Sequence, residues 1–433
     1  MNRIRRVGLV VLVWCVAAGG AWLLSTGCGE AENEQARQAA GAPKVEPPNL
    51  EPEVISPGVH PRLLFTAEQL PAIRARAKDP RGEHLFYWIR RNAFEHRDLV
   101  FKKLKDPEWV KQQREAARGH LNRFAPMVRN AGLAAIIGND PEDIAAAVAL
   151  YRIWLSSWPD DASKYKAGSW GMPHYAIAYD CLYNQLSEAE RAKSVRIFAS
   201  QIGPRAVEQM TDKWWQQGPS VNGRRTTNWT SIFGPNMGLT ALAIDDTDGA
   251  NPEMVRRTIL LTRHFLVNGV SRHGAMYEGV QYPMGYGTQN LAQFLAALEL
   301  RGVDLVTTTH LPKVPRWLTH ELYPWGGNAN AYNKSNGAFM AGSYVTYMAQ
   351  RFEGAADWVF YNSTWPGQQG HGEMVLIGGF LDRDRTATPP ADMPLCKWFS
   401  SRGIAFSRSG WGPRDAQLLT ITNPIGAGHT NAD

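Results

Sequence analysis

The chain has 433 residues, of which 44% are hydrophobic, and a formal net charge of +6. A chain of this size and composition buries a large core, which excludes an intrinsically disordered protein over most of its length. It contains no Walker loop, GxSxG elbow, HExxH motif or Rossmann glycine pattern, and its basic residues are scattered, so no nucleic-acid partner is expected. Of the four cysteines only Cys181 and Cys396 lie in the body, which excludes a disulfide framework.

The first 28 residues predict export. A charged stretch, Met1–Arg6, precedes an apolar run from 7 to 24, and small residues then lead to Cys28. This order is that of a secretion signal, and small residues before a cysteine resemble a lipoprotein cleavage box, so we expect a signal over 1–28 with lipidation at Cys28. An uncleaved anchor is the alternative, because the apolar run approaches membrane-spanning length. Either reading places the body in the periplasm or at the cell surface, with membrane contact only through the N-terminal lipid or anchor.

Residues 29–58 are rich in Glu, Ala and Pro and hold few large apolar side chains. Such a stretch buries too little apolar surface to offset the entropy of ordering, so a disordered linker is predicted. Without the signal and this acidic linker the body keeps a modest positive charge. That charge suits an acidic polymer, but it is also ordinary for a soluble domain.

From His60 onward, apolar residues recur at spacings of three and four, which predicts helix after helix. Proline and two acids at 141–143 fit a first turn, and Ser187 with Glu190 fits a capping box. The predicted helices cover 82–104, 119–137, 141–157, 170–184, 187–211, 228–244, 251–270 and 286–301. Neither a βαβ alternation nor a fixed-period repeat is present, so we expect residues 59–390 to form an α/α toroid.

The pattern of apolar residues changes near residue 390. Segments 403–408, 409–411 and 417–422 are short, strand-like and separated by glycines. We therefore expect residues 391–433 to be the start of an antiparallel β-sandwich domain that is truncated, because closing strands do not follow. The predicted fold is mainly α: an incomplete α/α toroid followed by the first strands of that domain.

Several segments, taken in order, carry a resemblance to a known family. They are His60–Thr66, residues 176–191, 227–243 and 277–287, and finally 405–411 with 428–433. Together they resemble the heparinase II/III-like and alginate lyase families of polysaccharide lyases over roughly residues 59–433. The resemblance implies cleavage of an acidic, uronate-containing polysaccharide by β-elimination, without a cofactor.

Such a reaction removes the proton at C5 of a uronate and expels the sugar held at O4. Hydrogen-bond donors must neutralise the carboxylate, and a tyrosine whose pKa is lowered by nearby cations can act as base and acid. The resemblance implies that Asn228 neutralises the carboxylate, that Tyr286 is the catalytic tyrosine with Tyr282 as its rival, and that His429 assists. A helix N-cap for Asn228 and core positions for the tyrosines remain open. Asn431 replaces the second histidine of zinc-containing relatives, so no metal is expected.

Substrate contacts are expected from the residues around this set. Arg224 and Arg225 could hold a carboxylate bidentately, although a solvated loop pair is equally consistent with the sequence. Trp229 stands where alginate-specific relatives often place histidine and offers a stacking surface. The remaining substrate-binding candidates are Glu278, Trp215 and His174; His371 is a further histidine for which a structural role is the default.

Two other functions remain open. Helical toroids also host glycoside hydrolases, which need two carboxylic acids across a cleft, and Glu278 and Asp180 are the evident pair. The second is a non-catalytic surface protein that binds glycans.

Overall fold

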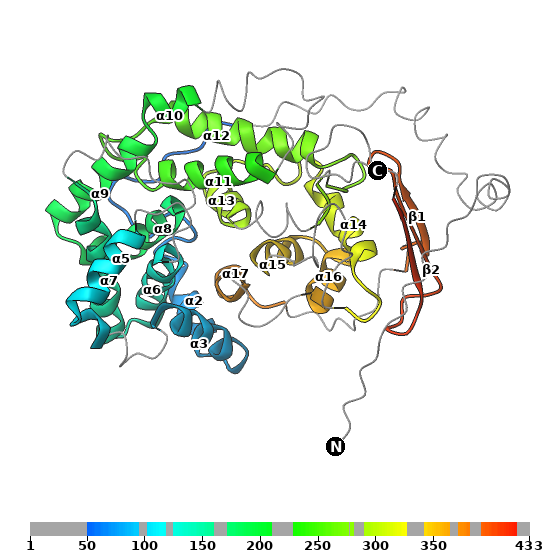
Figure 1. The fold of residues 1–433 in the computed structure, drawn as a ribbon, viewed down its shortest axis with the longest axis horizontal. Coiled ribbons are helices and arrows are strands. Elements are labelled where there is room, and N and C mark those ends of the chain that lie inside the picture. The colour runs from blue at the N-terminus through cyan, green and yellow to red at the C-terminus, as the bar shows by residue number, and fades with distance from the viewer. Residues whose placement is uncertain are drawn as a thin grey trace. The chain divides into compact units, whose positions relative to one another are not determined.

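The structure, a computed structural model, describes residues 50–94, 102–117, 124–159, 171–209, 228–276, 278–280, 290–326, 342–363, 371–381 and 391–421 (Figure 1). Residues 48–433 form one compact unit. The predicted signal, Cys28 and most of the predicted linker lie outside the described residues. Within the described ranges, no helix is both long and apolar enough to span a membrane. The predicted mainly α fold ending in antiparallel strands is confirmed.

Six helices, which we call the core helices, form a closed series of neighbours. Each packs against the next, and α3 (Pro80–Phe94) packs against both the last and the first. All residues of α8 are buried, as expected of a helix that is apolar all round. The core helices are α6 (Phe124–Gly138), α8 (Met172–Leu182), α11 (Asn228–Leu242), α13 (Leu291–Glu299), α15 (Gly342–Arg351) and α17 (His371–Gly378).

Five covering helices alternate with the core helices along the chain. Figure 1 shows α12 beside α11 and α7 beside α6, and both pairs are in contact. In α12 only one face is buried, which fits a helix between core and solvent. The covering helices are α7 (Pro141–Ser157), α9 (Glu188–Gln201), α12 (Pro252–His264), α14 (Val314–Glu321) and α16 (Ala355–Ser363). Three further α-helices in the described ranges are α2 (Leu70–Lys78), α5 (Pro107–Ala116) and α10 (Pro204–Gln209).

The helix starts read from the sequence are confirmed where they rest on caps. The Asp140 carboxylate accepts hydrogen bonds from two backbone N–H groups at the start of α7. Ser187 and Glu190 form a full capping box at α9. The continuous helix predicted over 187–211 is wrong, because α9 ends at Gln201 and Pro204 begins α10. Helices α14 to α17 were not predicted.

The core helices begin at a common end of the unit, which we call the starting end. Gln293 Nε2, in the first turn of α13, donates to Glu373 Oε1 in the first turn of α17 at 2.7 Å. Thr346, in the second turn of α15, lies 2.8 Å from Nδ1 of His371, the first residue of α17. Connections that lead into core helices are long, such as 210–227 before α11, whereas Asn139 and Asp140 alone join α6 to α7. The long connections therefore meet the unit at the starting end.

The opposite, finishing end is held by buried ion pairs. Asp180, in the last turn of α8, accepts hydrogen bonds from the backbone N–H of Arg62 at 2.9 Å and lies 2.6 Å from His60 Nδ1. Arg62 pairs with Asp245 at 2.5 Å, and Arg301 pairs with the same carboxylate at 3.2 Å. Burial raises the pKa of Asp245, and the two guanidinium groups oppose that shift. The network anchors the segment before α2 across the ends of α8, α11 and α13.

Helix α2 closes the series at the finishing end. Arg74 Nη2 donates to the Ile136 carbonyl at the end of α6 at 2.9 Å. Arg76 donates to the Leu376 and Ile377 carbonyls at the end of α17 at 2.5 and 2.8 Å. Cations at helix C-termini complement the helix dipole and satisfy carbonyls that have no partner within the helix. One short helix thus joins the first and last core helices.

A small antiparallel sheet follows, with strand order β1 (Cys396–Phe399), β2 (Ile404–Arg408) and β3 (Gln417–Ile421). The strands predicted at 403–408 and 417–422 are confirmed; β1 was not predicted, and 409–411 is a bend rather than a strand. Arg408 and Gln417 donate to the His320 carbonyl in α14 at 3.1 and 2.5 Å. Arg402 donates to the Met276 carbonyl at 3.1 Å. The sheet therefore packs against the end of α14 and beside the turn that holds Glu278.

Candidate functional site

Most of the candidate residues fall in connections that the structure does not describe. Asn228 and Trp229 are the first two residues of α11, and only their backbone is described. The helix start expected at Asn228 is confirmed, and first-turn N–H groups of this kind are available to an anion. The candidates outside the described residues are Tyr286, Tyr282, His429, Arg224, Arg225 and Trp215.

The described part of the starting end contains a buried polar cluster, formed by Arg129, Asn130, His174, Gln293 and Glu373. Arg129 Nη2 lies 3.3 Å from Glu373 Oε2, and its Nε and Nη2 donate to Asn130 Oδ1 at 3.3 and 3.1 Å. Gln293 donates to the other oxygen of Glu373. The cluster ties α6 and α13 to α17 at the depth of their first two turns.

His174, a substrate-binding candidate from the sequence, belongs to this cluster because the charge of Arg129 acts on it. Burial first, and then the positive charge of Arg129, lower the pKa of His174 well below its ordinary value. The imidazole is therefore neutral at pH 7, and its Nδ1 makes no hydrogen bond within the described part of the chain. Arg129 Nη1 is likewise without a hydrogen-bond acceptor among the described residues, although Arg129 is only 1% exposed. A buried cation and a neutral imidazole thus lie close to the starting end.

Glu278 lies beneath the surface. It is 2% exposed and belongs to a turn in which the Gly279 N–H donates to the Met276 carbonyl at 3.2 Å. Gly279 has a φ of +76°, a conformation that glycine adopts without strain. Arg402 from the sheet binds the same Met276 carbonyl. The turn that carries Glu278 is therefore held between the helical part and the sheet.

His371 has a local structural role. Its Nδ1 is shared with the Thr346 hydroxyl, and its ring packs against Phe360. Burial lowers the pKa of His371 to about 4. At neutral pH it is an uncharged link between α15 and α17.

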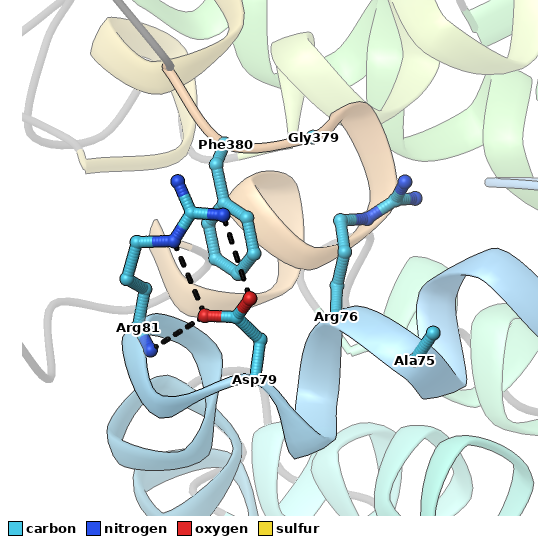
Figure 2. A pocket seen from close by; sticks show the side chains of 6 residues that line it. All are labelled: Ala75, Arg76, Asp79, Arg81, Gly379 and Phe380. Atoms are coloured by element: carbon cyan, nitrogen blue, oxygen red, sulfur yellow. Dashed lines mark hydrogen bonds and ion pairs between the residues drawn. The ribbon is translucent and has the colours of Figure 1, made fainter.

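A surface pocket of about 350 Å³ lies elsewhere, at the finishing end (Figure 2). Asp79 and Arg81 face each other in an ion pair, and the Arg81 guanidinium lies 4.2 Å from the Phe380 ring centroid. Arg76 in its wall is already bound to the last carbonyls of α17. The charged groups of this pocket are occupied in holding α2, α3 and α17 together, so it is not the candidate site.

The sequence analysis missed Arg129, Gln293 and Glu373. A usable signal existed for two of them, because Arg129 interrupts an apolar stretch in α6 and Glu373 directly precedes the apolar run of α17. Charged residues are almost never fully buried unless they are paired. Within the described ranges, no group of three His, Cys, Asp or Glu side chains could hold a metal ion.

No protein-family model matches the sequence, and no curated protein is significantly similar to it.

Proposed function

We propose that this protein is a polysaccharide lyase that cleaves an acidic, uronate-containing polymer by β-elimination, and that its closed series of core helices is an α/α toroid. The observation that supports this most is the shared starting end. The connections that carry Tyr282, Tyr286, Arg224 and Arg225 lead into α11 and α13 there, beside a helix that begins at Asn228. Core-helix N-termini, with their partial positive charge, favour a polyanion at that end.

The proposed reaction needs one proton removed and one delivered. Tyr286 as phenolate takes the C5 proton, the electron pair of that bond forms the C4–C5 double bond, and the C4–O4 bond breaks. The departing oxygen receives a proton from the tyrosine or from His429. The Asn228 amide and the N–H groups of the first turn of α11 stabilise the charge that develops on the carboxylate.

The buried cluster around Arg129 supports this chemistry without touching the substrate. The charge of Arg129 is balanced by Glu373, so the cluster adds a local dipole rather than a free cation. The cluster also fixes how the first turns of α6, α13 and α17 meet. In this proposal it preorganises the starting end, while the connections supply the groups that touch substrate.

The hydrolase alternative is less well supported. Its first carboxylate, Asp180, is buried at the finishing end and binds His60 and the backbone of Arg62. Its second, Glu278, belongs to the connection that leads towards α13 at the other end. Two acids that attack one glycosidic bond must flank a single cleft, roughly 5 to 10 Å apart.

The test is the ultraviolet absorbance of unsaturated uronate products. The chain from residue 29 is incubated with heparan sulfate, chondroitin, hyaluronan, alginate and glucuronan in separate reactions. We expect a rise with one class of polymer, and loss of that rise by at least about a hundredfold in Tyr286→Phe, since general acid–base groups contribute that much or more.

The matched control is Tyr87→Phe, at an exposed position on α3. It should keep full activity. No absorbance from folded protein with any polymer would reject the lyase, and reducing sugar without absorbance would favour the hydrolase. Retention of the polymer without any cleavage would favour a glycan-binding protein.

A further inference from the structure

The turn after α14 presents a stacked pair of aromatic rings. The Tyr323 and Trp325 ring centroids lie 4.8 Å apart, and the ring planes differ by 15°. Trp325 is nevertheless 70% exposed, more than any other large hydrophobic side chain in the described ranges. Tyr323 covers one face of the indole, so the exposed area belongs to its other face and edges.

This turn is rigid. The Gly326 N–H donates to the Tyr323 carbonyl at 2.9 Å, which closes a four-residue turn with Pro324 at its second position. Proline fixes its own φ and favours that position. Gly326 has a φ of +73°, and a Cβ there would lie 3.0 Å from the Asn362 carbonyl at the end of α16. The backbone is thus pinned against α16, and the indole is held ready for a ligand with little further loss of entropy.

The pair lies on the connection that leads into core helix α15. Arg224 and Arg225 likewise lie on the connection into α11, and Tyr282 and Tyr286 on that into α13. Charges of both signs lie near the neighbouring end of α14: Arg316 is paired with Asp392, buried Arg408 is bound to main-chain carbonyls, and Lys397 is exposed. After burial, the charges of Arg408, Lys397 and Arg316 are the causes that lower the pKa of His320 to about 3. Exposed Lys397 therefore supplies positive charge near the end of α14 from which this turn follows, as a polyanion requires.

We propose that Trp325, supported by Tyr323, is a platform on which one pyranose ring of an acidic polysaccharide stacks, outside the catalytic centre. The C–H face of a pyranose is apolar and slightly positive, and an indole face is apolar and carries the negative side of its quadrupole. Glycans supply such flat C–H faces at regular intervals along a charged chain. The inference rests on the proposed function for its ligand class, but not for cleavage.

Binding is measured by electrophoresis in native gels that contain one of the five polymers named above. The proteins compared are the parent, Trp325→Ala, Trp325→Phe and the control Tyr87→Ala, each also in a Tyr286→Phe background that leaves the polymer intact. We expect Trp325→Ala to weaken retardation about tenfold in apparent affinity, Trp325→Phe to retain part of it, and Tyr87→Ala to match the parent.

Kinetics give the second readout. If a polymer is cleaved, Trp325→Ala should raise KM for the long polymer about tenfold with kcat unchanged, and it should leave a short oligosaccharide unaffected, because a remote subsite contributes uniform binding. Retardation that depends on Trp325 without any unsaturated product would uphold the platform and reject the lyase. Equal retardation of Trp325→Ala and the parent would overturn the platform. The platform would also be overturned if the parent sedimented as a dimer and Trp325→Ala as a monomer while retardation was unchanged, since the indole would then bind a second copy of the chain.

Discussion

Replacement of Asp180 by asparagine tests whether the finishing end is structural. The carboxylate accepts two backbone N–H groups, those of Arg62 and Leu63 at 2.9 to 3.0 Å, and lies 2.6 Å from His60 Nδ1. Asparagine keeps the size but turns one oxygen into a donor, so a buried N–H loses its acceptor and the charge-assisted bonds weaken. Losses of this kind sum to about 3 to 5 kcal/mol.

The magnitude can be followed by thermal melting. With an unfolding entropy near 2.1 cal/mol/K per residue, a unit of this size should lose roughly 4 to 6 °C in Tm. Asp392→Asn is the control, because Asp392 is 67% exposed in its ion pair with Arg316 and should shift Tm by less than about 1 °C. A Tm for Asp180→Asn within 1 °C of the parent would refute the reasoning. If turnover vanished while Tm held, Asp180 would be a catalytic acid and the hydrolase alternative would gain.

Three further predictions follow from the described contacts. Glu373→Gln leaves the Arg129 guanidinium buried without its counter-charge, so unfolding in urea should show a loss of about 3 to 5 kcal/mol, and adding Arg129→Met should restore part of it; no recovery in the double variant would contradict the pairing. His371 stays neutral in the folded protein down to about pH 4 but titrates near 6.5 when unfolded, so stability is full above pH 6.5 and falls by up to about 3 kcal/mol as pH drops to 4. His371→Gln should flatten that part of the urea-midpoint profile, and an unchanged slope would exclude His371 as its source. Gly238→Ala places a methyl group against the Phe294 ring where α11 packs on α13. We expect the free energy of unfolding to fall by about 1 to 3 kcal/mol in the same urea assay. An unchanged free energy would mean that the two helices can separate freely.

The sequence predictions that were confirmed depend on residues that are close together in the chain. The capping residues before α7 and α9 lie next to the backbone that they satisfy, so spacing alone reveals them. Helix α17 escaped notice because it is short and apolar on nearly every side, which removes the 3.6-residue period. Helix α15 keeps such a period but is also short. Strand β1 was missed since Lys397 and Trp398 are both exposed and give no alternation.

In the candidate site, too, the features set by neighbouring residues could be predicted, and those set by distant residues could not. A helix start at Asn228 could be read from neighbouring residues, and it is confirmed. The Arg129–Glu373 pairing could not be read in this way, because the two residues are far apart in the sequence and come together only in the folded chain. The roles of Tyr286 and His429 stay predictions.

The bonds from Arg76 to the end of α17 span 300 residues of sequence. During synthesis, at about 5 to 20 residues per second, the N-terminal helices would wait roughly 15 to 60 s for this partner to emerge. During that interval their apolar faces are only partly buried, and the growing chain is vulnerable to aggregation and proteolysis. A chaperone that holds α2 and α3 until α17 appears would therefore raise the yield of native protein more than one that acts on the finished chain.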